Sequence, residues 1–281
     1  MAAVTPLSST TRYPLSTHQT SRLPRKHFIK SSVIDPLLDI EREYRASLLG
    51  LLSPPPFENS LGWKTPLTPG QYALVTCGAQ DKNRIYCNGL DLTEALALDH
   101  FFQHVLNPLY TKFLKFPIPT IAAINGHAFA GGFCLALAHD YRIMKDNEQK
   151  GRAMMAMNEV EFGAPVPMGL IAVIEAKFPT TKLVVKCLTE AHRFTAKESL
   201  ELGIVDSLAP ESEVVQRSLK LGLDKSIRAT TGVYGIIKES VYRDSIKILG
   251  CSADENADIK SIHTSRLFRL SKHVSSGKPK L

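Results

Sequence analysis

The stretch NGHAFAGGFCLALAHD, residues 125–140, decides the fold of this chain. It lies between two apolar runs, PTIAAI and YRIM, so we expect it to join two buried strands through a helix. Gly131 and Gly132 stand where the strand gives way to that helix. Their spacing to Gly126 excludes both the GxGxxG dinucleotide motif and the GxxxxGK(S/T) phosphate loop. Two explanations remain open: unpaired N–H groups at the helix start that bind an oxygen anion, or close packing that leaves no room for a side chain.

A second turn of the same kind occurs earlier in the chain. The segment YCNGLDL, residues 86–92, also follows an expected strand, and its Asp91 can cap the next helix. The backbone N–H groups of Asn88 and Gly131 can together bracket one carbonyl oxygen. Such a pair of donors is an oxyanion hole, in which each donor typically contributes about 3–4 kcal/mol of transition-state stabilisation.

The order of the expected elements indicates the fold class. From Gln71 onward strands alternate with helices, which is typical of a layered α/β domain with a largely parallel sheet. Residues 35–52 have apolar positions at helical spacing, and a proline-rich segment follows them. We therefore expect five divisions: a disordered or targeting arm (1–34), an amphipathic helix with a proline-rich linker (35–70), the α/β core (71–210), a C-terminal helical region (211–268) and a tail (269–281).

The composition limits the classes of function. The chain has 281 residues, of which 44% are hydrophobic, so it can bury one full-sized core, and no apolar run is long enough to span a membrane. Residues 1–34 and 260–281 carry five and six basic residues and no acids, so the net charge of +7 comes from the tails and the part between them is net negative. This distribution, without interleaved basic and aromatic residues, argues against nucleic-acid binding.

The cysteines and histidines form no metal-binding pattern. The five cysteines include no CxxC pair, which indicates a reducing compartment and small core residues. His100 and His104 have i, i+4 spacing, but no Glu lies between them and no third ligand is evident, so a solvated helix face is favoured. We expect His127 to be a packed or surface residue rather than an electrophile.

Four motifs, in this order and at these separations, resemble the crotonase (enoyl-CoA hydratase/isomerase) superfamily and are most similar to the plant-type peroxisomal 3-enoyl-CoA isomerases: YCNGLDL, PTIAAINGHAFAGGFCLALAHDYRIM, NEVEFGAPVP and FTAKESLELGIVDSL. The resemblance covers about residues 71–243. It implies a crotonase-like layered spiral of parallel strands and helices with a C-terminal helical region. It also implies that the N–H groups of Asn88 and Gly131 form an oxyanion hole for the thioester carbonyl of an acyl-CoA.

The glutamates separate the chemistries of this superfamily. Hydratases have two of them, whereas in this chain Cys134 occupies the first position and Glu159 the second. One glutamate opposite an oxyanion hole suits a proton shuttle, in which Glu159 removes a proton at C2 of a 3-enoyl-CoA and returns it at C4. Burial among apolar neighbours would raise its pKa. Glu161 is the alternative base, although an extended turn would point it to the opposite side.

The acyl chain requires an apolar channel, and the residues that flank the two turns are the candidates to line it, although each can equally belong to the core. The predicted substrate-binding residues are Gly89, Leu90, Asp91, Leu92, Phe129, Gly132, Phe133 and Met168. Lys82 or Arg84 can meet the CoA phosphates. We expect no metal and no cofactor besides the CoA that the substrate carries.

Residues 1–70 do not resemble the strand pair with which members of the superfamily normally begin. The N-terminal strands are therefore expected to be missing or replaced, which would leave one edge of the sheet exposed. Besides an isomerase of fatty-acid β-oxidation, two alternatives stay open. One is another single-glutamate activity, such as acyl-CoA hydrolysis or weak hydration, and the other is a catalytically silent CoA-binding subunit.

The two ends of the chain indicate different destinations. The C-terminal tripeptide Pro279-Lys280-Leu281 is similar to the Ser-Lys-Leu signal that the peroxisomal import receptor binds, so we expect a peroxisomal protein. The basic, Ser/Thr-rich N-terminus resembles a transit peptide and leaves a plastid or a mitochondrion as the alternative. The family resemblance further implies a homo-oligomer, usually a trimer.

Overall fold

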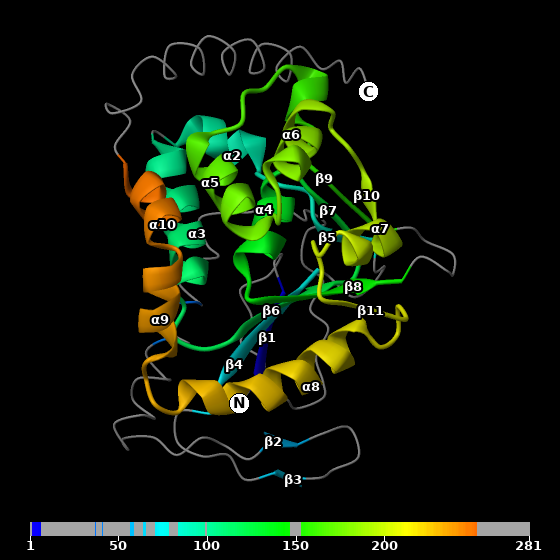
Figure 1. Ribbon diagram of the computed structural model, residues 1–281, viewed down its shortest axis with the longest axis vertical. Helices are drawn as coiled ribbons and strands as arrows, with labels where there is room; N and C mark the ends of the chain where they lie inside the picture. The colour runs from blue at the N-terminus through cyan, green and yellow to red at the C-terminus, as the bar shows by residue number, and fades with distance from the viewer. Residues whose placement is uncertain are drawn as a thin grey trace.

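The computed structural model describes residues 2–6, 37, 41, 57–58, 64–65, 71–78, 84–98, 100–146 and 153–251. They form an α/β fold built around a five-stranded parallel sheet with helices on both faces (Figure 1). The strand order of this sheet is β1 (Ala2–Pro6), β4 (Ala73–Cys77), β6 (Thr120–Ile124), β8 (Tyr141–Lys145) and β11 (Ser207–Ala209). The predicted parallel α/β architecture is therefore confirmed.

A smaller sheet carries the two turns. Its strand order is β10 (Phe194–Thr195), β9 (Met154–Ala156), β7 (His127–Phe129) and β5 (Ile85–Cys87), and β7 is parallel to both β5 and β9. The sequence pattern predicts a direct passage from β6 into a helix, and β7 corrects this expectation. A strand of three residues is too short to be recognised from alternation of polar and apolar residues. A separate antiparallel pair is formed by β2 (Phe57–Glu58) and β3 (Lys64–Thr65).

Helices connect the strands and cover the sheets. Those within the described residues are α2 (Leu92–Ala97), the π-helical η2 (Phe102–Leu106), α3 (Asn107–Leu114), α4 (Gly131–Ala138), η3 (Glu159–Phe162), α5 (Met168–Lys177), α6 (Thr181–Thr189), α7 (Ala196–Glu201), α8 (Val214–Ser226), η4 (Ile227–Ala229), α9 (Tyr234–Val241) and α10 (Arg243–Gly250). The last of them, α10, packs against α3 and α5 (Figure 1).

The large sheet separates two layers of hydrophobic core. On β4, Val75 points to the face that α8 covers, where it packs in a cluster with Leu219. The preceding residue, Leu74, points to the opposite face and joins the larger core cluster, which contains all the side chains of α4 from Phe133 onward. Because α4 is buried on every side, it acts as a fixed support for whatever its first residue contacts.

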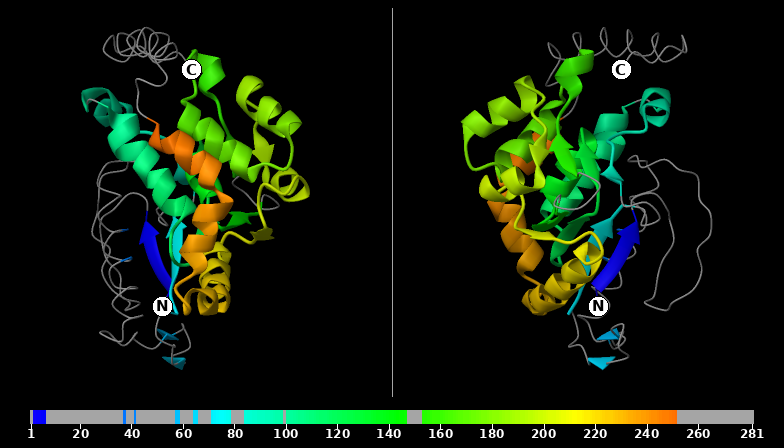
Figure 2. Two further views of the ribbon diagram at one scale, coloured as in Figure 1. Left: turned by 60° about the vertical axis from the view of Figure 1, so that its left-hand side comes forward. Right: turned by 90° about the vertical axis from the view of Figure 1, so that its right-hand side faces the viewer.

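The sheet edge beside β4 is not exposed. β1 pairs in parallel with β4, from Ala2 opposite Ala73 to Pro6 opposite Cys77 (Figure 2). This corrects the expectation of an open edge, since a strand from the first residues replaces the pair that the sequence lacks. The segment becomes a strand through its pairing with β4, which its own residues do not indicate.

Several predicted segments lie outside the described residues. Of the predicted helix at residues 35–52, only Leu37 and Glu41 are described; Leu37 is buried in the larger core cluster and Glu41 forms an ion pair with Lys112. Residues 252–281, which include the predicted tail, are also outside. No helix in the described part of the chain is both long enough and apolar enough to cross a bilayer.

Candidate active site

The two glycine-containing turns meet beyond β5 and β7. A Cβ atom on Gly132 would lie 2.2 Å from the carbonyl oxygen of Cys87, and a Cβ atom on Gly89 would lie 3.3 Å from the nitrogen of Gly131. Gly89 also has a φ of +96°, which favours glycine. Close packing, one of the two explanations for the glycine pair, is therefore present. The same packing brings the segment of Asn88 and Gly89 next to the Gly131 nitrogen.

A strained residue opens α4. Ala130 has φ 53° and ψ −130°, a conformation that residues other than glycine rarely adopt. Its N–H donates to the Ala156 carbonyl at 2.8 Å, and its carbonyl accepts from the Phe133 N–H at 2.9 Å. Gly131 is consequently the first helical residue, whose N–H has no partner inside the helix. The hydrogen bonds between described residues include none from the N–H of Gly131 or of Asn88.

Glu159 is the first residue of η3 and follows closely on β9. Its side chain is buried, and its Oε2 atom has no hydrogen-bond partner. Burial raises the pKa of this carboxyl from 4.5 to about 7. Burial also raises the pKa of Cys134 and of Tyr110, and the charge of Glu159 raises both further. The carboxyl thus lies close to α3 and to the first turn of α4.

Cys134 stands at the first of the two positions where the family resemblance predicts a glutamate in hydratases. Its sulfur is fully buried, 3.7 Å from the Met157 sulfur and 3.9 Å from the Leu170 carbonyl oxygen. Burial raises the pKa of the thiol well above its ordinary value, so it stays protonated. A buried neutral thiol cannot replace a carboxylate in activating water.

Glu161 lies on the surface. Both of its carboxylate oxygens accept hydrogen bonds from Arg193, at 2.8 and 2.9 Å. This bidentate pair lowers the pKa of Glu161, which remains ionised. Of the two carboxylates in this turn, only Glu159 is available to an apolar interior.

The predicted substrate-binding residues differ in exposure. Two are half-buried (Leu90 and Phe129) and two exposed (Leu92 and Met168), whereas four are buried: Gly89, Asp91, Gly132 and Phe133. The Phe133 ring packs with the rings of Phe178 and Phe194 at centroid distances of 5.9 and 6.1 Å. Phe133 therefore belongs to the core, which is the alternative that the sequence left open for each of these residues.

Among the histidines of the region, His127 is partly packed and His100 and His104 are exposed. His127 is half-buried, its ring lies 5.0 Å from that of Phe129, and burial lowers its pKa, so the ring is neutral. The rings of His100 and His104 meet edge to face at 5.8 Å. No three His, Cys, Asp or Glu side chains come close enough to hold a metal ion in the part of the chain that the structure describes. Arg84 is exposed, and Lys82 lies outside the described residues.

Two buried polar residues of α3 escape sequence reasoning. The Tyr110 hydroxyl donates a hydrogen bond of 2.9 Å to the Gly131 carbonyl. The Asn107 Oδ1 atom is buried without a partner, 2.6 Å from where a Cβ atom on Gly169 would lie. Tyr110 occupies an apolar position of an expected helix, a pattern that predicts burial but not which carbonyl the hydroxyl meets.

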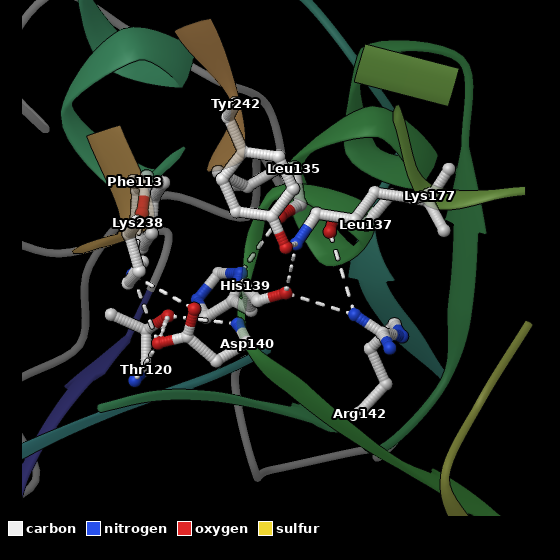
Figure 3. Close-up of polar contacts among 10 residues, drawn as sticks. All are labelled: Phe113, Thr120, Leu135, Leu137, His139, Asp140, Arg142, Lys177, Lys238 and Tyr242. Carbon is white, nitrogen blue, oxygen red and sulfur yellow. Dashed lines mark hydrogen bonds and ion pairs between the residues drawn. The ribbon is translucent and has the colours of Figure 1, made fainter. Parts of the chain in front are cut away.

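Cations surround the opposite end of α4 (Figure 3). The carbonyl of His139, just beyond the helix, accepts from the Arg142 guanidinium at 2.8 Å and from the Lys177 ammonium at 3.3 Å. Lys238 of α9 forms a buried ion pair with Asp140 at 2.8 Å. Positive charge near a helix C-terminus is favourable, so the cluster stabilises α4 in the orientation that points its N-terminus at the two turns.

The electrostatics of this cluster come from burial. The His139 ring is fully buried, which lowers its pKa to about 3 and keeps it neutral between the Leu135 carbonyl at 2.7 Å and the Thr76 hydroxyl at 2.9 Å. Burial also lowers the pKa of Lys177 to about 7, although its ammonium donates to the Tyr242 hydroxyl at 2.7 Å. The histidine thus has a structural role.

Known proteins share both the sequence pattern and the fold. Residues 73–259 match the family model described as enoyl-CoA hydratase/isomerase. The chain is 34% identical over 199 residues to enoyl-CoA delta isomerase 2, peroxisomal, of Arabidopsis thaliana, which covers 66% of this chain and 80% of that protein. A solved methylmalonyl-CoA decarboxylase is similar with a TM-score of 0.64 at 18% identity, covering 91% of this chain and 89% of that one. An enoyl-CoA hydratase from Mycobacterium marinum gives a TM-score of 0.55 at 21% identity, covering 63% and 75%. The chain therefore belongs to the enoyl-CoA hydratase/isomerase family and has the crotonase fold.

Proposed function

We propose that this protein is an enoyl-CoA isomerase, which converts a 3-enoyl-CoA into the 2-trans-enoyl-CoA. The observation that carries the proposal is Glu159, a buried carboxyl with an unpaired oxygen and a pKa of about 7. It follows the strand whose last carbonyl holds the start of α4. The Arabidopsis relatives named enoyl-CoA delta isomerases support the same reaction.

In the first step, the N–H groups of Asn88 and Gly131 donate to the thioester carbonyl oxygen. Charge that develops on this oxygen is stabilised there, so the proton at C2 becomes acidic enough for the Glu159 carboxylate to remove. The electron pair of the broken C–H bond delocalises over a dienolate that extends from the thioester oxygen to C4. A positioned general base of this kind contributes about 10²–10⁴-fold to the rate.

In the second step, the protonated carboxyl of Glu159 returns its proton at C4. The double bond then lies between C2 and C3, where it is conjugated with the thioester, and the carboxylate is restored without net proton uptake. A pKa of about 7 suits both steps, because the carboxyl gains and loses a proton with similar ease near neutral pH.

Isomerisation fits this site better than hydration does. Addition of water requires a second acid–base group that activates the water or protonates the substrate. Cys134, at the position where hydratases have their other glutamate, is a buried neutral thiol. A silent subunit is favoured by missing leading strands, and β1 occupies the sheet edge beside β4. Acyl-CoA hydrolysis stays an alternative that an assay separates.

The test is turnover of 3-hexenoyl-CoA, followed by the absorbance of the conjugated product. Glu159→Gln should lower kcat at least about 100-fold, because it removes the only proposed proton carrier. Glu161→Gln is the matched control and should retain the wild-type rate, since Glu161 points outward to Arg193. Equal rates for wild type and Glu159→Gln would exclude the proposal. Release of free CoA instead of a conjugated product would identify a hydrolase.

We propose acyl-CoA as the ligand, with no cofactor besides its own CoA, and the peroxisome as the location. Two of the Arabidopsis relatives are named peroxisomal. The tripeptide Pro279-Lys280-Leu281, on which import would depend, lies outside the described residues. A fluorescent protein fused after Leu281 covers the tripeptide and should abolish peroxisomal import. The same fluorescent protein fused before Met1 leaves the tripeptide free and should not. Unchanged location would favour the N-terminal signal.

We also propose a homo-oligomer, with a trimer as the form that family resemblance implies. The helix α9 exposes three apolar side chains, which are 58–64% accessible: Ile236, Ile237 and Val241. Apolar area of this kind is commonly covered in an assembly. Light scattering coupled to size exclusion should give three times the chain mass of 31.0 kDa. A monomer at micromolar concentration would contradict the proposal.

A further inference from the structure

A buried hydrogen bond joins α3 to the first residue of α4. The hydroxyl of Tyr110 donates to the carbonyl of Gly131 at 2.9 Å, and the tyrosine ring is fully buried. We propose that Tyr110 is a positioning residue that fixes the orientation of the Gly131 donor in the oxyanion hole. The inference rests on the proposed function of that donor.

Gly131 needs such support because of the residue before it. Ala130 has φ 53° and ψ −130°, so relaxation of the backbone toward ordinary angles would lower the free energy of the turn. Relaxation would rotate the peptide between Ala130 and Gly131, which carries the Gly131 N–H. Glycine has no side chain that limits this rotation. The direction of the N–H therefore depends on what the Ala130 carbonyl of the same peptide binds, which is the Phe133 N–H at 2.9 Å, and on what the backbone groups on either side bind.

Two hydrogen bonds hold the backbone on either side of this N–H. On one side, the Ala130 N–H donates to the Ala156 carbonyl at 2.8 Å, which ties the turn to β9. On the other side, the Gly131 carbonyl accepts from Tyr110. A donor between two anchored groups is held in one direction, as a preorganised oxyanion hole requires. Removing the Tyr110 hydroxyl releases the anchor at Gly131 and leaves two others, the bond from the Ala130 N–H to Ala156 and the bond from the Phe133 N–H to the Ala130 carbonyl.

The surroundings of Tyr110 keep its hydroxyl a donor. Burial raises its pKa well above the ordinary value, and the nearby Cys134, Cys87 and Glu159 raise it further, so the phenol stays protonated. A carbonyl oxygen can only accept, which fixes the direction of the hydrogen bond. Cys134 belongs to α4, Cys87 to the end of β5 at the first turn, and Glu159 to η3. Tyr110 thus lies where the parts of the proposed site meet and acts through Gly131.

The experiment compares Tyr110→Phe with Tyr86→Phe. Both tyrosines are fully buried, and the Tyr86 hydroxyl bonds to the hydroxyl of Thr76 at 2.8 Å, away from Gly131. Each variant loses one buried hydroxyl bond, so similar losses of stability are expected. Tyr110→Phe should lower kcat about 10-fold with little change in KM, which is part of the 10²–10³-fold that loss of a whole donor costs. Tyr86→Phe should keep kcat within about 2-fold, because the hole retains both anchors.

A second measurement does not depend on turnover. Hexanoyl-CoA labelled with ¹³C at the thioester carbonyl has no double bond to move, and its carbonyl stretching band should shift to lower frequency on binding to the wild type, because the hole polarises the bond. The shift should be smaller in Tyr110→Phe and unchanged in Tyr86→Phe. Introducing p-aminophenylalanine at position 110, which restores a donor, should recover both the band and kcat.

The outcomes separate the inference from the function on which it rests. If the two phenylalanine variants give the same band and the same kcat, or if p-aminophenylalanine restores neither, Tyr110 has only a structural role and the inference is wrong. If the wild type itself shows no shift, the thioester does not bind in the hole, and the proposed function fails together with the inference. If Tyr110→Phe does not fold, the p-aminophenylalanine protein decides, and a wild-type band and rate support the inference.

Discussion

Replacing Glu159 by Gln should stabilise the protein above pH 7 and leave its stability nearly unchanged at pH 4. The folded state raises the pKa of this carboxyl from 4.5 to about 7, which corresponds to about 3 kcal/mol. The side chain is 8% exposed, so solvent screens little of this energy. Between pH 4.5 and about 7 the folded protein binds more protons than the unfolded chain does. The free energy of unfolding of the wild type therefore falls as pH rises through this window, and it stays low above it.

Glutamine carries no charge and avoids this loss, so the variant should exceed the wild type by about 3 kcal/mol at pH 8. Urea unfolding followed by circular dichroism, repeated from pH 4 to pH 8, measures the difference. Glu161→Gln serves as the control and should show no such gain, because Arg193 lowers the pKa of Glu161. A difference between wild type and Glu159→Gln that does not change with pH would show that the Glu159 pKa is ordinary. Glu159 would then not be a carboxyl that burial shields from water.

Four further outcomes are expected. The value of kcat/KM should fall about tenfold per pH unit below pH 7 and level off above it, because only ionised Glu159 accepts the C2 proton, and a flat profile from pH 5 to 8 would contradict this. Ala130→Gly should raise the thermal midpoint by about 2–4 °C in calorimetry, since glycine tolerates φ 53°, and a lower midpoint would argue against strain there. Gly132→Ala should abolish isomerase activity and cost about 1–3 kcal/mol in denaturant unfolding, because its Cβ atom would lie 2.2 Å from a backbone oxygen of the first turn. Asp140→Asn should cost about 3–5 kcal/mol by leaving Lys238 buried and unpaired, and the double variant with Lys238→Met should recover most of this loss in the same assay.

The fold could be predicted where one local pattern decides an element. The runs PTIAAI and YRIM form β6 and β8, and the part of the intervening stretch from Gly131 onward forms α4, as their continuous apolar character predicts. The two turns are indicated by their glycines between an expected strand and an expected helix, and Glu159 by the family resemblance. The close contact between the two turns could not be predicted from the sequence, because Gly132 and Cys87 are far apart in the chain.

The features that the sequence did not show are tertiary. β1 exists through its pairing with β4, β7 is three residues long, and neither has a local signature. The hydrogen bonds of Glu161 are made with Arg193, which lies on another segment. Tyr110 likewise appears in sequence as one more apolar position, although its hydroxyl meets the Gly131 carbonyl. Hydrogen bonds between distant side chains and backbone groups leave no periodic pattern to detect.

The buried pair of Lys238 and Asp140 has a consequence for biosynthesis. Asn88, Gly131 and Glu159 are all synthesised well before α9. The carboxylate of Asp140, beside the end of α4, has no Lys238 to pair with until α9 has left the ribosome. A nascent chain that stops short of α9 contains every residue of the proposed site but cannot bury Asp140 at low energy. We expect such chains to stay open and to recruit chaperones, so that emergence of α9 sets the moment at which the enzyme closes.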